Sequence, residues 1–301
     1  MMDAQAARAR PGPDGLGPAY EILAPETQSK PLVFASPHSG ADYPPDFVAT
    51  SRLDPLALRM SEDSFVDEIF AAAPQLGAPL LRALFPRAYI DANREAFELD
   101  PAMFVDPLPD YANTRSPRVA AGLGTIARTV ANGTNIYRQK LTFAEALFRL
   151  RNYYWPYHQA LRDLIEGTRS RFGYCILIDC HSMPSIGGPM DRDPGNRRVD
   201  FVLGDRYGRS CDPAILEAAE QVLCDFGYVV TRNKPYSGGY VTDHYGRPEA
   251  GVHALQIEIN RGLYMNERRI ERGSHLPVLS QRIRQVISAL GGVRLEARPQ
   301  R

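Results

Sequence analysis

Side chains that can bind a metal ion or transfer a proton stand at the ends of several apolar runs in this sequence. The segment CILIDCHSMPS passes from an apolar run to Asp179 and His181, and the run PLVFAS is followed closely by His38. Glu258 lies within another largely apolar segment, QIEIN. Zinc-assisted hydrolysis needs three imidazole or carboxylate ligands, an open position for water and a nearby carboxylate base. His38, His181 and one acid can supply the ligands, which leaves Glu258 as the base.

Alternation along a strand indicates which of these side chains can act together, because successive side chains point to opposite faces. Asp179 and His181 share one face, so Asp179 can accept a hydrogen bond from a metal-binding His181 imidazole. Cys180 points the other way, which excludes a nucleophile and base pair made of Cys180 and His181. Glu258 stands on the polar face of QIEIN, where it is either a salt-bridge partner or an acid–base catalyst.

The apolar patterns around these residues are typical of buried strands that alternate with helices. We expect strands within PLVFAS, APLLRAL, RAYIDANR, CILID, VDFVLGD, YVVTRN and VHALQIEIN. Helical spacing and capping residues predict helices at 52–73, at 141–173 with a kink at Pro156, at 212–227 and at 276–290. This order predicts a single α/β domain with a mostly parallel mixed sheet flanked by helices, and active groups at the carboxyl ends of its strands.

Three stretches lack such periodicity. Residues 95–135 are polar and rich in Pro, Gly and Asn, and we expect a loop with little structure of its own, since loops of that length are usually lids or mobile insertions. We expect residues 1–29 to be a disordered leading segment and residues 292–301 a disordered tail. The catalytic domain is then expected to span residues 30–291.

Charge and composition exclude several classes of partner. The 301 residues carry 35 basic and 35 acidic side chains, so the chain has no field that would gather nucleic acid or an anionic membrane. No apolar stretch reaches the ~20 residues that span a bilayer, and the first residues lack the core of a signal peptide, so we expect a cytoplasmic protein. Four irregularly spaced cysteines indicate neither a disulfide framework nor a thiolate zinc site. The expected partner is a small molecule, and the sequence carries no signal for an oligomeric state.

Seven segments, in order along the chain, resemble the N-formylglutamate amidohydrolase family. They are PHSGADYP, DSFVDEIF, YIDANRE, YYWPYHQAL, ILIDCHSM, SGGYVTDHYGRP and ALQIEINRGLYMNE. More distantly, IDANR, LIDCHS, PYSGG and the IEI strand are similar to the zinc carboxypeptidases. The resemblance implies a zinc-carboxypeptidase-like fold and one bound Zn²⁺ ion. It also implies hydrolysis of the amide of a small dianionic N-acyl amino acid, N-formyl-L-glutamate before others.

The resemblance assigns roles to individual residues. His38 and His181 correspond to the two zinc-binding imidazoles, and Glu258 corresponds to the general base. Asn93 and Arg94 correspond to the pair that binds a carboxylate of the substrate. An arginine near the metal would help to stabilise the oxyanion.

The carboxylate ligand departs from the carboxypeptidase pattern. In those enzymes it stands three residues after the first histidine, and here that position is Ala41. We expect Asp63 to replace it, because the amidohydrolases carry an aspartate at that point of the DSFVDEIF segment. The alternatives are Glu62, Asp67 and Asp42.

A dianionic substrate calls for two forked cation contacts, which Arg provides better than Lys. Besides Arg94, the candidates are Arg138 in IYRQKLT and Arg247 in HYGRP; each is otherwise a solvated surface residue. His244 and Tyr240 lie in a glycine-rich stretch that can close over a ligand. A fold and a metal site do not choose the acyl group, so a peptidase or a different N-acyl amino acid deacylase is an alternative. A non-catalytic binder on the same scaffold is another.

Overall fold

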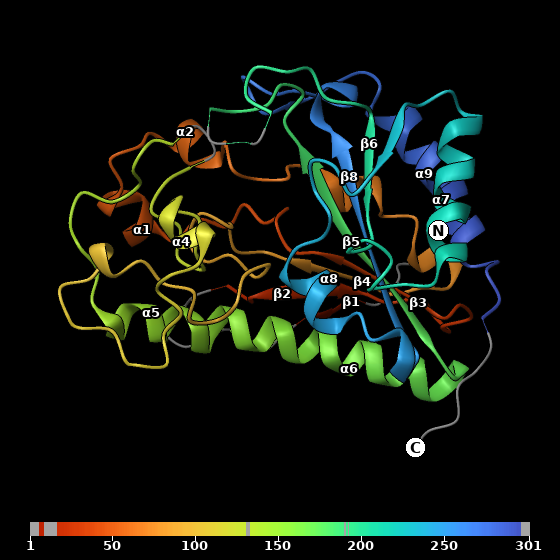
Figure 1. Cartoon of the computed structure of the whole chain (residues 1–301), viewed down its shortest axis with the longest axis horizontal. Helices are drawn as coiled ribbons and strands as arrows, with labels where there is room; N and C mark the ends of the chain where they lie inside the picture. The colour runs from red at the N-terminus through yellow and green to blue at the C-terminus, as the bar shows by residue number, and fades with distance from the viewer. Residues whose placement is uncertain (1–5, 9–16, 131–132, 190, 192, 296–301) are drawn as a thin grey trace.

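One mixed β-sheet forms the centre of the molecule (Figure 1). The computed structural model describes residues 6–8, 17–130, 133–189, 191 and 193–295. Across the sheet the strands run in the order β1-β2-β4-β3-β5-β8-β6-β7, and β9 and β10 form a separate hairpin. The strands are Ala6–Arg8 (β1), Tyr20–Leu23 (β2), Leu32–Ser36 (β3), Leu80–Ala83 (β4), Cys175–Met183 (β5), Phe201–Gly204 (β6), Val230–Arg232 (β7), Val252–Asn260 (β8), Met265–Asn266 (β9) and Glu271–Arg272 (β10).

The strands at the middle of the sheet run parallel. β4 pairs with β3, β3 with β5 and β5 with β8, all in parallel, and β6 pairs with β7 in the same way. The β1–β2, β2–β4 and β6–β8 pairs are antiparallel. The prediction of a single α/β domain with a mostly parallel mixed sheet is therefore confirmed. Because β3, β5 and β8 point the same way, side chains at their carboxyl ends meet at one edge of the sheet.

Helices cover both faces of this sheet (Figure 1). Val33 and Leu177 belong to the apolar layer under α6, whereas Phe34 and Ile178 belong to the layer under α3, α7 and α9. Among the described residues, none of the helices has both the length and the apolar character to cross a membrane. The helices are Pro45–Thr50 (α1), Pro55–Arg59 (α2), Val66–Ile69 (α3), Pro117–Ala120 (α4), Phe143–Arg149 (α5), Trp155–Phe172 (α6), Pro213–Asp225 (α7), Tyr240–Tyr245 (α8) and Leu276–Leu290 (α9).

The helical region at 141–173 is interrupted just before its proline. Thr142 and Glu145 form the expected capping box at the start of α5. A π-helical turn at Leu150–Tyr154 then joins α5 to α6, and Pro156 lies in the first turn of α6. Proline has no N–H to donate, so the α-helical hydrogen-bond pattern is broken at this point and the wider turn accommodates the break.

Two of the expected elements are wrong. Residues 52–73 do not form one helix but contain α2 and α3, because Phe65 has a φ of 67°, in the left-handed region that a continuous helix does not enter. Residues 87–94 form turns in place of a strand, and the backbone N–H groups of Tyr89 and Ile90 both donate to the carbonyl of Pro86. Ile90 is fully buried, so its apolar character reflects packing from a turn.

Residues 17–29, expected within a disordered segment, join the domain instead. β2 pairs with β4 in this region, and the buried Glu21 accepts from Arg82 at 2.5 Å. Residues 6–8 also join the sheet as β1, which pairs with β2, and Val293 and Leu295 of the expected tail pack against the apolar layer under α3, α7 and α9. Residues 1–5, 9–16 and 296–301 of the expected disordered ends lie outside the described residues.

The region 95–135 has more structure than its composition predicts. It contains a 3₁₀ turn at Pro101–Met103 and the short helix α4. Leu99, Met103 and Ile126 of this region form a small apolar core of their own, together with residues at and after Leu141. The region is therefore a packed subregion of the domain, and it forms one wall of the site described next.

Candidate active site

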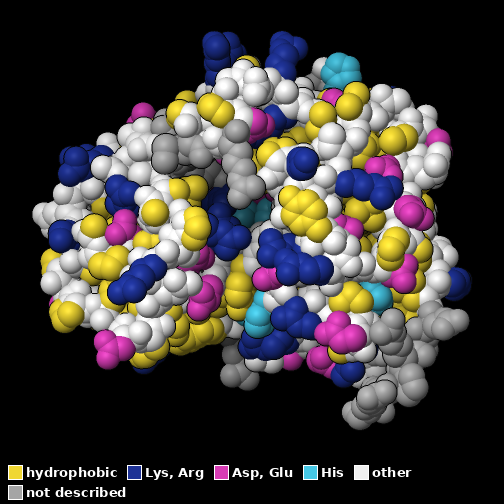
Figure 2. Space-filling model, in the orientation of Figure 1, with side chains coloured by type: hydrophobic (Ala, Val, Ile, Leu, Met, Phe, Trp, Pro, Cys, Tyr) yellow, Lys and Arg dark blue, Asp and Glu magenta, His cyan; other side chains and the backbone are white. Residues whose placement is uncertain are grey.

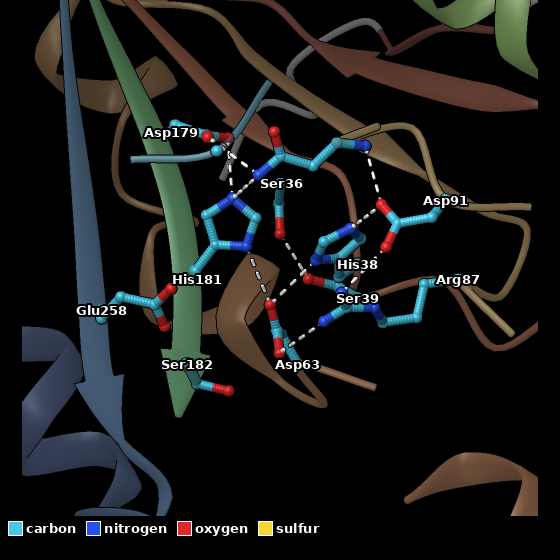
Figure 3. A network of polar contacts seen from close by, with 12 residues as sticks. Ser36, His38, Ser39, Asp63, Arg87, Asp91, Asp179, His181, Ser182 and Glu258 are labelled. Atoms are coloured by element: carbon cyan, nitrogen blue, oxygen red, sulfur yellow. Dashed lines mark hydrogen bonds and ion pairs between the residues drawn. The ribbon is translucent and has the colours of Figure 1, made fainter. Parts of the chain in front are cut away.

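The carboxyl ends of three adjacent strands bring the candidate residues together (Figure 3). His38 follows β3, His181 lies near the end of β5, and Glu258 lies near the end of β8. His181 and Glu258 are Cα partners across the parallel β5–β8 pair, so their side chains leave the sheet on the same face. Cys180 is buried in the apolar layer on the opposite face, as its place in the strand predicts.

His38, Asp63 and His181 form one buried group of potential metal ligands. Asp63 Oδ2 lies 2.9 Å from His181 Nδ1 and 3.2 Å from His38 Nδ1. The three ligand atoms all lie within 4.8 Å of one another. Tetrahedral zinc with ligand bonds of about 2.0–2.2 Å needs ligand atoms at such spacings, so these donors suit the ion both in chemistry and in position.

Each histidine is held by a second carboxylate through its other ring nitrogen. His38 Nε2 lies 2.7 Å from Asp91 Oδ1, and His181 Nε2 lies 3.0 Å from Asp179 Oδ1 (Figure 3). These contacts orient both rings so that Nδ1 faces Asp63. A carboxylate behind each ligating imidazole is the usual arrangement in metal sites, because it fixes the ring and raises the basicity of the ligand.

The alternatives to Asp63 are occupied elsewhere or exposed. Glu62 accepts from Tyr43 and Arg59, outside the histidine pair. Asp67 pairs with Arg82 at 2.6 Å, and Asp42 is exposed. Of the four acids, the structure brings only Asp63 to the two histidines.

The carboxylates around the histidines make the site favourable for a cation. Burial alone would lower the pKa of His181, but Asp179 and Asp63 raise that pKa well above its ordinary value. Hydrogen bonds from His181 and His38 hold the pKa of Asp63 well below its ordinary value, although burial opposes this. Positive charge at this position is therefore stabilised by its surroundings.

Glu258 stands beside this group in an environment suited to proton transfer. Its side chain is buried, and Gln256 Nε2 donates to its Oε1 at 2.8 Å. Burial raises the pKa of Glu258 to about 7, since His181 lowers it less than burial raises it. A carboxyl with a pKa near neutrality is matched to general acid–base catalysis.

These residues line a cavity of about 570 Å³. Its wall away from the sheet comes from the region 95–135, and basic side chains, dark blue in Figure 2, border the hollow on the face shown there. Asn93 and Arg94 line the cavity as expected; Asn93 Oδ1 accepts from the backbone of Val241, and Arg94 Nε donates to the carbonyl of Leu123. The arginines in the lining are Arg87, Arg94, Arg118, Arg206 and Arg261.

Three of the predicted substrate residues lie outside this lining. Arg138 is exposed and its Nε donates to the carbonyl of Ser51 at 2.7 Å. Arg247 is exposed and its Nη1 donates to the carbonyl of Gly246, while His244 is exposed beside it. Their guanidinium and ring groups stabilise backbone or face solvent, so the structure does not bring them to His38, Asp63 and His181.

Four of the lining arginines were not predicted from the sequence. Arg87 is the first residue of the RAYIDANR segment, so its closeness in sequence to Asp91 and Asn93 was the available signal. Arg206 and Arg261 directly follow the expected strands VDFVLGD and VHALQIEIN, so their place after a strand end was the available signal. Arg118 stands in the aperiodic stretch 95–135, and only the fold directs it to the cavity. Arg87 Nη2 donates to Asp91 Oδ2 at 2.9 Å.

The chain matches one family model and is similar to several known proteins. The model for the family described as N-formylglutamate amidohydrolase matches residues 30–265. The chain is 32% identical over 251 residues to an N-formylglutamate deformylase of Pseudomonas aeruginosa, covering 82% of this chain and 86% of that protein. It is 31% identical over 241 residues to an N-formylglutamate deformylase of Pseudomonas putida, covering 79% of this chain and 82% of that protein. A crystal structure of N-formylglutamate amidohydrolase from Ralstonia eutropha JMP134 aligns with a TM-score of 0.84 at 38% identity, covering 91% of this chain and 97% of that chain.

Proposed function

The chain belongs to the N-formylglutamate amidohydrolase family, enzymes that act on amides, and we propose that it hydrolyses N-formyl-L-glutamate to formate and L-glutamate. One observation carries the proposal: a His–Asp–His group, a carboxyl with a pKa near neutrality and a wall of arginines share a single cavity. The substrate combines an amide to be cleaved with two carboxylates to be bound.

We assign the metal position to one Zn²⁺ ion held by His38, Asp63 and His181. Two imidazoles and a carboxylate are a usual ligand set for catalytic zinc, which keeps a further position open. Such an ion, when bound, polarises the formyl carbonyl and lowers the pKa of a water molecule.

Glu258 carries the proton through the reaction. As a carboxylate it takes a proton from the attacking water, and the water oxygen forms a bond to the formyl carbon. The C–N bond then breaks, and Glu258 returns the proton to the departing nitrogen, which leaves as the amine of glutamate. The balance is one water consumed, with formate and glutamate released.

Arginines stabilise the negative charges of the substrate and of the transition state. Arg87 lies between Asp91 and Asp63, with Nη1 3.9 Å from Asp63 Oδ1, and we assign it to the oxyanion that forms on the formyl oxygen. Asn93 and Arg94 are assigned to the carboxylate nearest the amide, the α-carboxylate. Arg261 has its donors engaged by Ser182, Met60 and Asp63, so we assign it to holding the metal ligand.

A substrate panel tests the function. Zinc-loaded protein is incubated with N-formyl-, N-acetyl- and N-succinyl-glutamate, and formate, acetate, succinate and free glutamate are measured. The proposal expects equal amounts of formate and glutamate from the formyl compound, with the highest kcat/KM of the three. Turnover of N-acetylglutamate without turnover of N-formylglutamate would instead assign the chain to a different N-acyl amino acid. Absence of turnover with all three, in protein that holds its metal, would favour a binder without catalysis.

A further inference from the structure

The substrate proposed above has two carboxylates, and Arg94 accounts for one of them. Arg87 pairs with Asp91, the carboxylate behind His38, and Arg261 pairs with Asp63 of the His38–Asp63–His181 group, called the metal group below. Arg206, at the cavity rim, donates to Asp243 at 2.8 Å and is 3.4 Å from the carbonyl of Gly238. The remaining arginine of the lining is Arg118, whose ion pair with Glu98 is long at 3.7 Å.

Hydrogen bonds at the start of α4 fix the backbone position of Arg118. It lies in α4, whose N-cap Ser116 accepts from the backbone N–H of Val119 at 3.1 Å. The hydroxyl of Ser116 in turn donates to Glu98, a buried carboxylate. The start of α4 is thus anchored to the packed subregion at 95–135, so Arg118 projects from a defined backbone position although its side chain is 39% exposed.

The backbone of one residue, Leu123, connects Arg118 to Arg94. The N–H of Leu123 donates to the carbonyl of Arg118 at 2.8 Å, and the carbonyl of Leu123 accepts from Arg94 Nε at 2.9 Å. Both arginines therefore stand on the same wall of the cavity. Arg94 is the deeper of the two, with a side chain only 14% exposed, and it lies 3.9 Å from Asp91 behind the metal group.

We propose that Arg118 binds the side-chain carboxylate of the substrate and so makes the enzyme selective for acidic N-acyl amino acids. The inference rests on the proposed function and deepens it. In N-formylglutamate the α-carboxylate is three bonds from the reacting carbon and the side-chain carboxyl carbon is five, counted from the covalent structure. Arg94, the deeper arginine, therefore suits the α-carboxylate, and Arg118, the outer arginine, suits the side-chain carboxylate.

The charges on this wall support the assignment. Burial lowers the pKa of Arg94 to about 10, against the effect of Asp91, and the nearby positive charge of Arg118 adds to the lowering. The nearest carboxylates lie 3.9 Å from Arg94 and 3.7 Å from Arg118, so neither positive charge is closely paired and the two guanidinium groups repel each other until an anion lies between them or binds both. A dicarboxylate supplies that compensation, and a substrate with one carboxylate supplies only part of it.

The test compares two substrates that differ only at the side-chain end, N-formyl-L-glutamate and N-formyl-L-glutamine. The quantity measured is the ratio of their kcat/KM values for wild type, Arg118→Gln, Arg118→Lys and two control variants, all zinc-loaded. In wild type we expect the ratio to favour the glutamate compound strongly. In Arg118→Gln we expect the ratio to fall roughly 10- to 100-fold, through KM for the glutamate compound, because a charge-assisted contact is lost. Arg118→Lys keeps the positive charge, and we expect its ratio to lie between those of wild type and Arg118→Gln.

Two variants serve as matched controls. Arg115→Gln removes an exposed arginine three positions away on the same segment, outside the cavity, and is expected to keep the wild-type ratio. Arg206→Gln removes the other rim arginine, and a collapse of the ratio in Arg206→Gln with none in Arg118→Gln would overturn the inference in favour of Arg206. An equal loss for both substrates in Arg118→Gln, with an unchanged ratio, would also overturn it. Wild type without turnover of N-formylglutamate would overturn the proposed function itself, and the inference with it; the wild-type arm therefore separates the two failures.

Discussion

Glu258 lies on β8, the strand next to β5, which carries His181 of the metal group. Its Cα is in register with that of His181, and the two side chains share the face that opens into the cavity. A proton acceptor at this position can reach a water molecule at the metal group without being a ligand itself. Buried and bonded by Gln256, it is held in one place for the reaction.

Replacing Glu258 by Gln should abolish proton transfer while leaving the metal ligands intact. We expect kcat for N-formylglutamate to fall about 10³-fold, the usual contribution of a positioned general base. Formate release and the zinc content of the purified variant are measured together, with the exposed Glu249→Gln as a control. Near-normal turnover by a Glu258→Gln variant that holds zinc would rule out this role.

The same substitution should change how stability depends on pH in metal-free protein. The pKa of Glu258 is raised from 4.5 to about 7 on folding, so the folded state binds its proton more tightly than the unfolded state does. Its contribution to stability is therefore present below about pH 4.5 and is lost as the pH rises to about 7. Glu258→Gln mimics the protonated form, so its stability relative to wild type should rise by up to about 3 kcal/mol between pH 4 and pH 8. Urea unfolding at both pH values measures this difference, and a constant difference would contradict it.

At the scale of elements, α6 fastens the turn that carries Asn93 and Arg94. His158, buried in α6, donates through Nε2 to the carbonyl of Ala92 at 2.9 Å, and Tyr154 donates to the carbonyl of Arg94 at 2.7 Å. Burial lowers the pKa of His158 to about 3, so the ring stays neutral at working pH. A neutral imidazole has one N–H to donate, and the contact with Tyr245 occupies its other nitrogen.

His158→Ala should loosen this attachment. We expect the free energy of unfolding to fall by about 2–4 kcal/mol, since a buried ring and its hydrogen bonds are lost. Any remaining activity should show a raised KM, because Asn93 and Arg94, which we assign to a substrate carboxylate, are no longer held. The exposed His275→Ala is the matched control in denaturant unfolding and kinetics. An unchanged unfolding midpoint in His158→Ala would show that α6 does not hold the turn.

Gly239, at the start of α8, lets the backbone approach Asn93 closely. A Cβ at this position would lie 2.6 Å from Asn93 Cγ, closer than any ordinary contact. Gly239→Ala should therefore displace Asn93 and raise KM by roughly 10-fold, with a smaller change in kcat. Gly167→Ala, where a Cβ would meet nothing within 4 Å in the exposed part of α6, should leave KM unchanged and stabilise the fold by up to about 1 kcal/mol. Identical kinetics for the two variants would refute this role of Gly239.

Strand ends were predictable from the sequence, whereas residues in irregular segments were not. His38, His181 and Glu258 follow or end apolar runs, and a parallel sheet brings such positions together whatever the loops do. The prediction of Asp63 as the carboxylate ligand rests on the family resemblance, because nothing in the spacing of DSFVDEIF distinguishes it from Glu62.

The directions of side chains in loops and turns could not be predicted from the sequence. Arg138 and Arg118 both stand in aperiodic stretches, and only backbone contacts such as that of Leu123 with Arg118 decide which one reaches the cavity. The helix expected at 52–73 failed for a similar reason, since apolar spacing does not reveal the left-handed residue Phe65.

At the scale of the whole molecule, the sheet forms the rigid half of the site and the region 95–135 the other half. β3 and β5 are buried on both faces, so the positions of His38 and His181 are set by the core and not by a ligand. The opposing wall belongs to a subregion with its own apolar core. Of the residues to which we assign catalysis, His38, His181 and Glu258 thus stand at or near strand ends of the sheet, and the arginines assigned to the substrate carboxylates stand on and beside the subregion.

A zinc titration tests whether the protein hydrolyses N-formyl-L-glutamate with a metal ion held by His38, Asp63 and His181. Protein stripped with a chelator is titrated with Zn²⁺ while formate release is followed, alongside Asp63→Asn. We expect activity to rise linearly to a plateau at one zinc per chain, and the variant to show neither tight zinc uptake nor turnover. Full turnover by the stripped protein would show that hydrolysis does not depend on the metal. An activity plateau at one zinc per chain in Asp63→Asn would show that Asp63 is not a ligand.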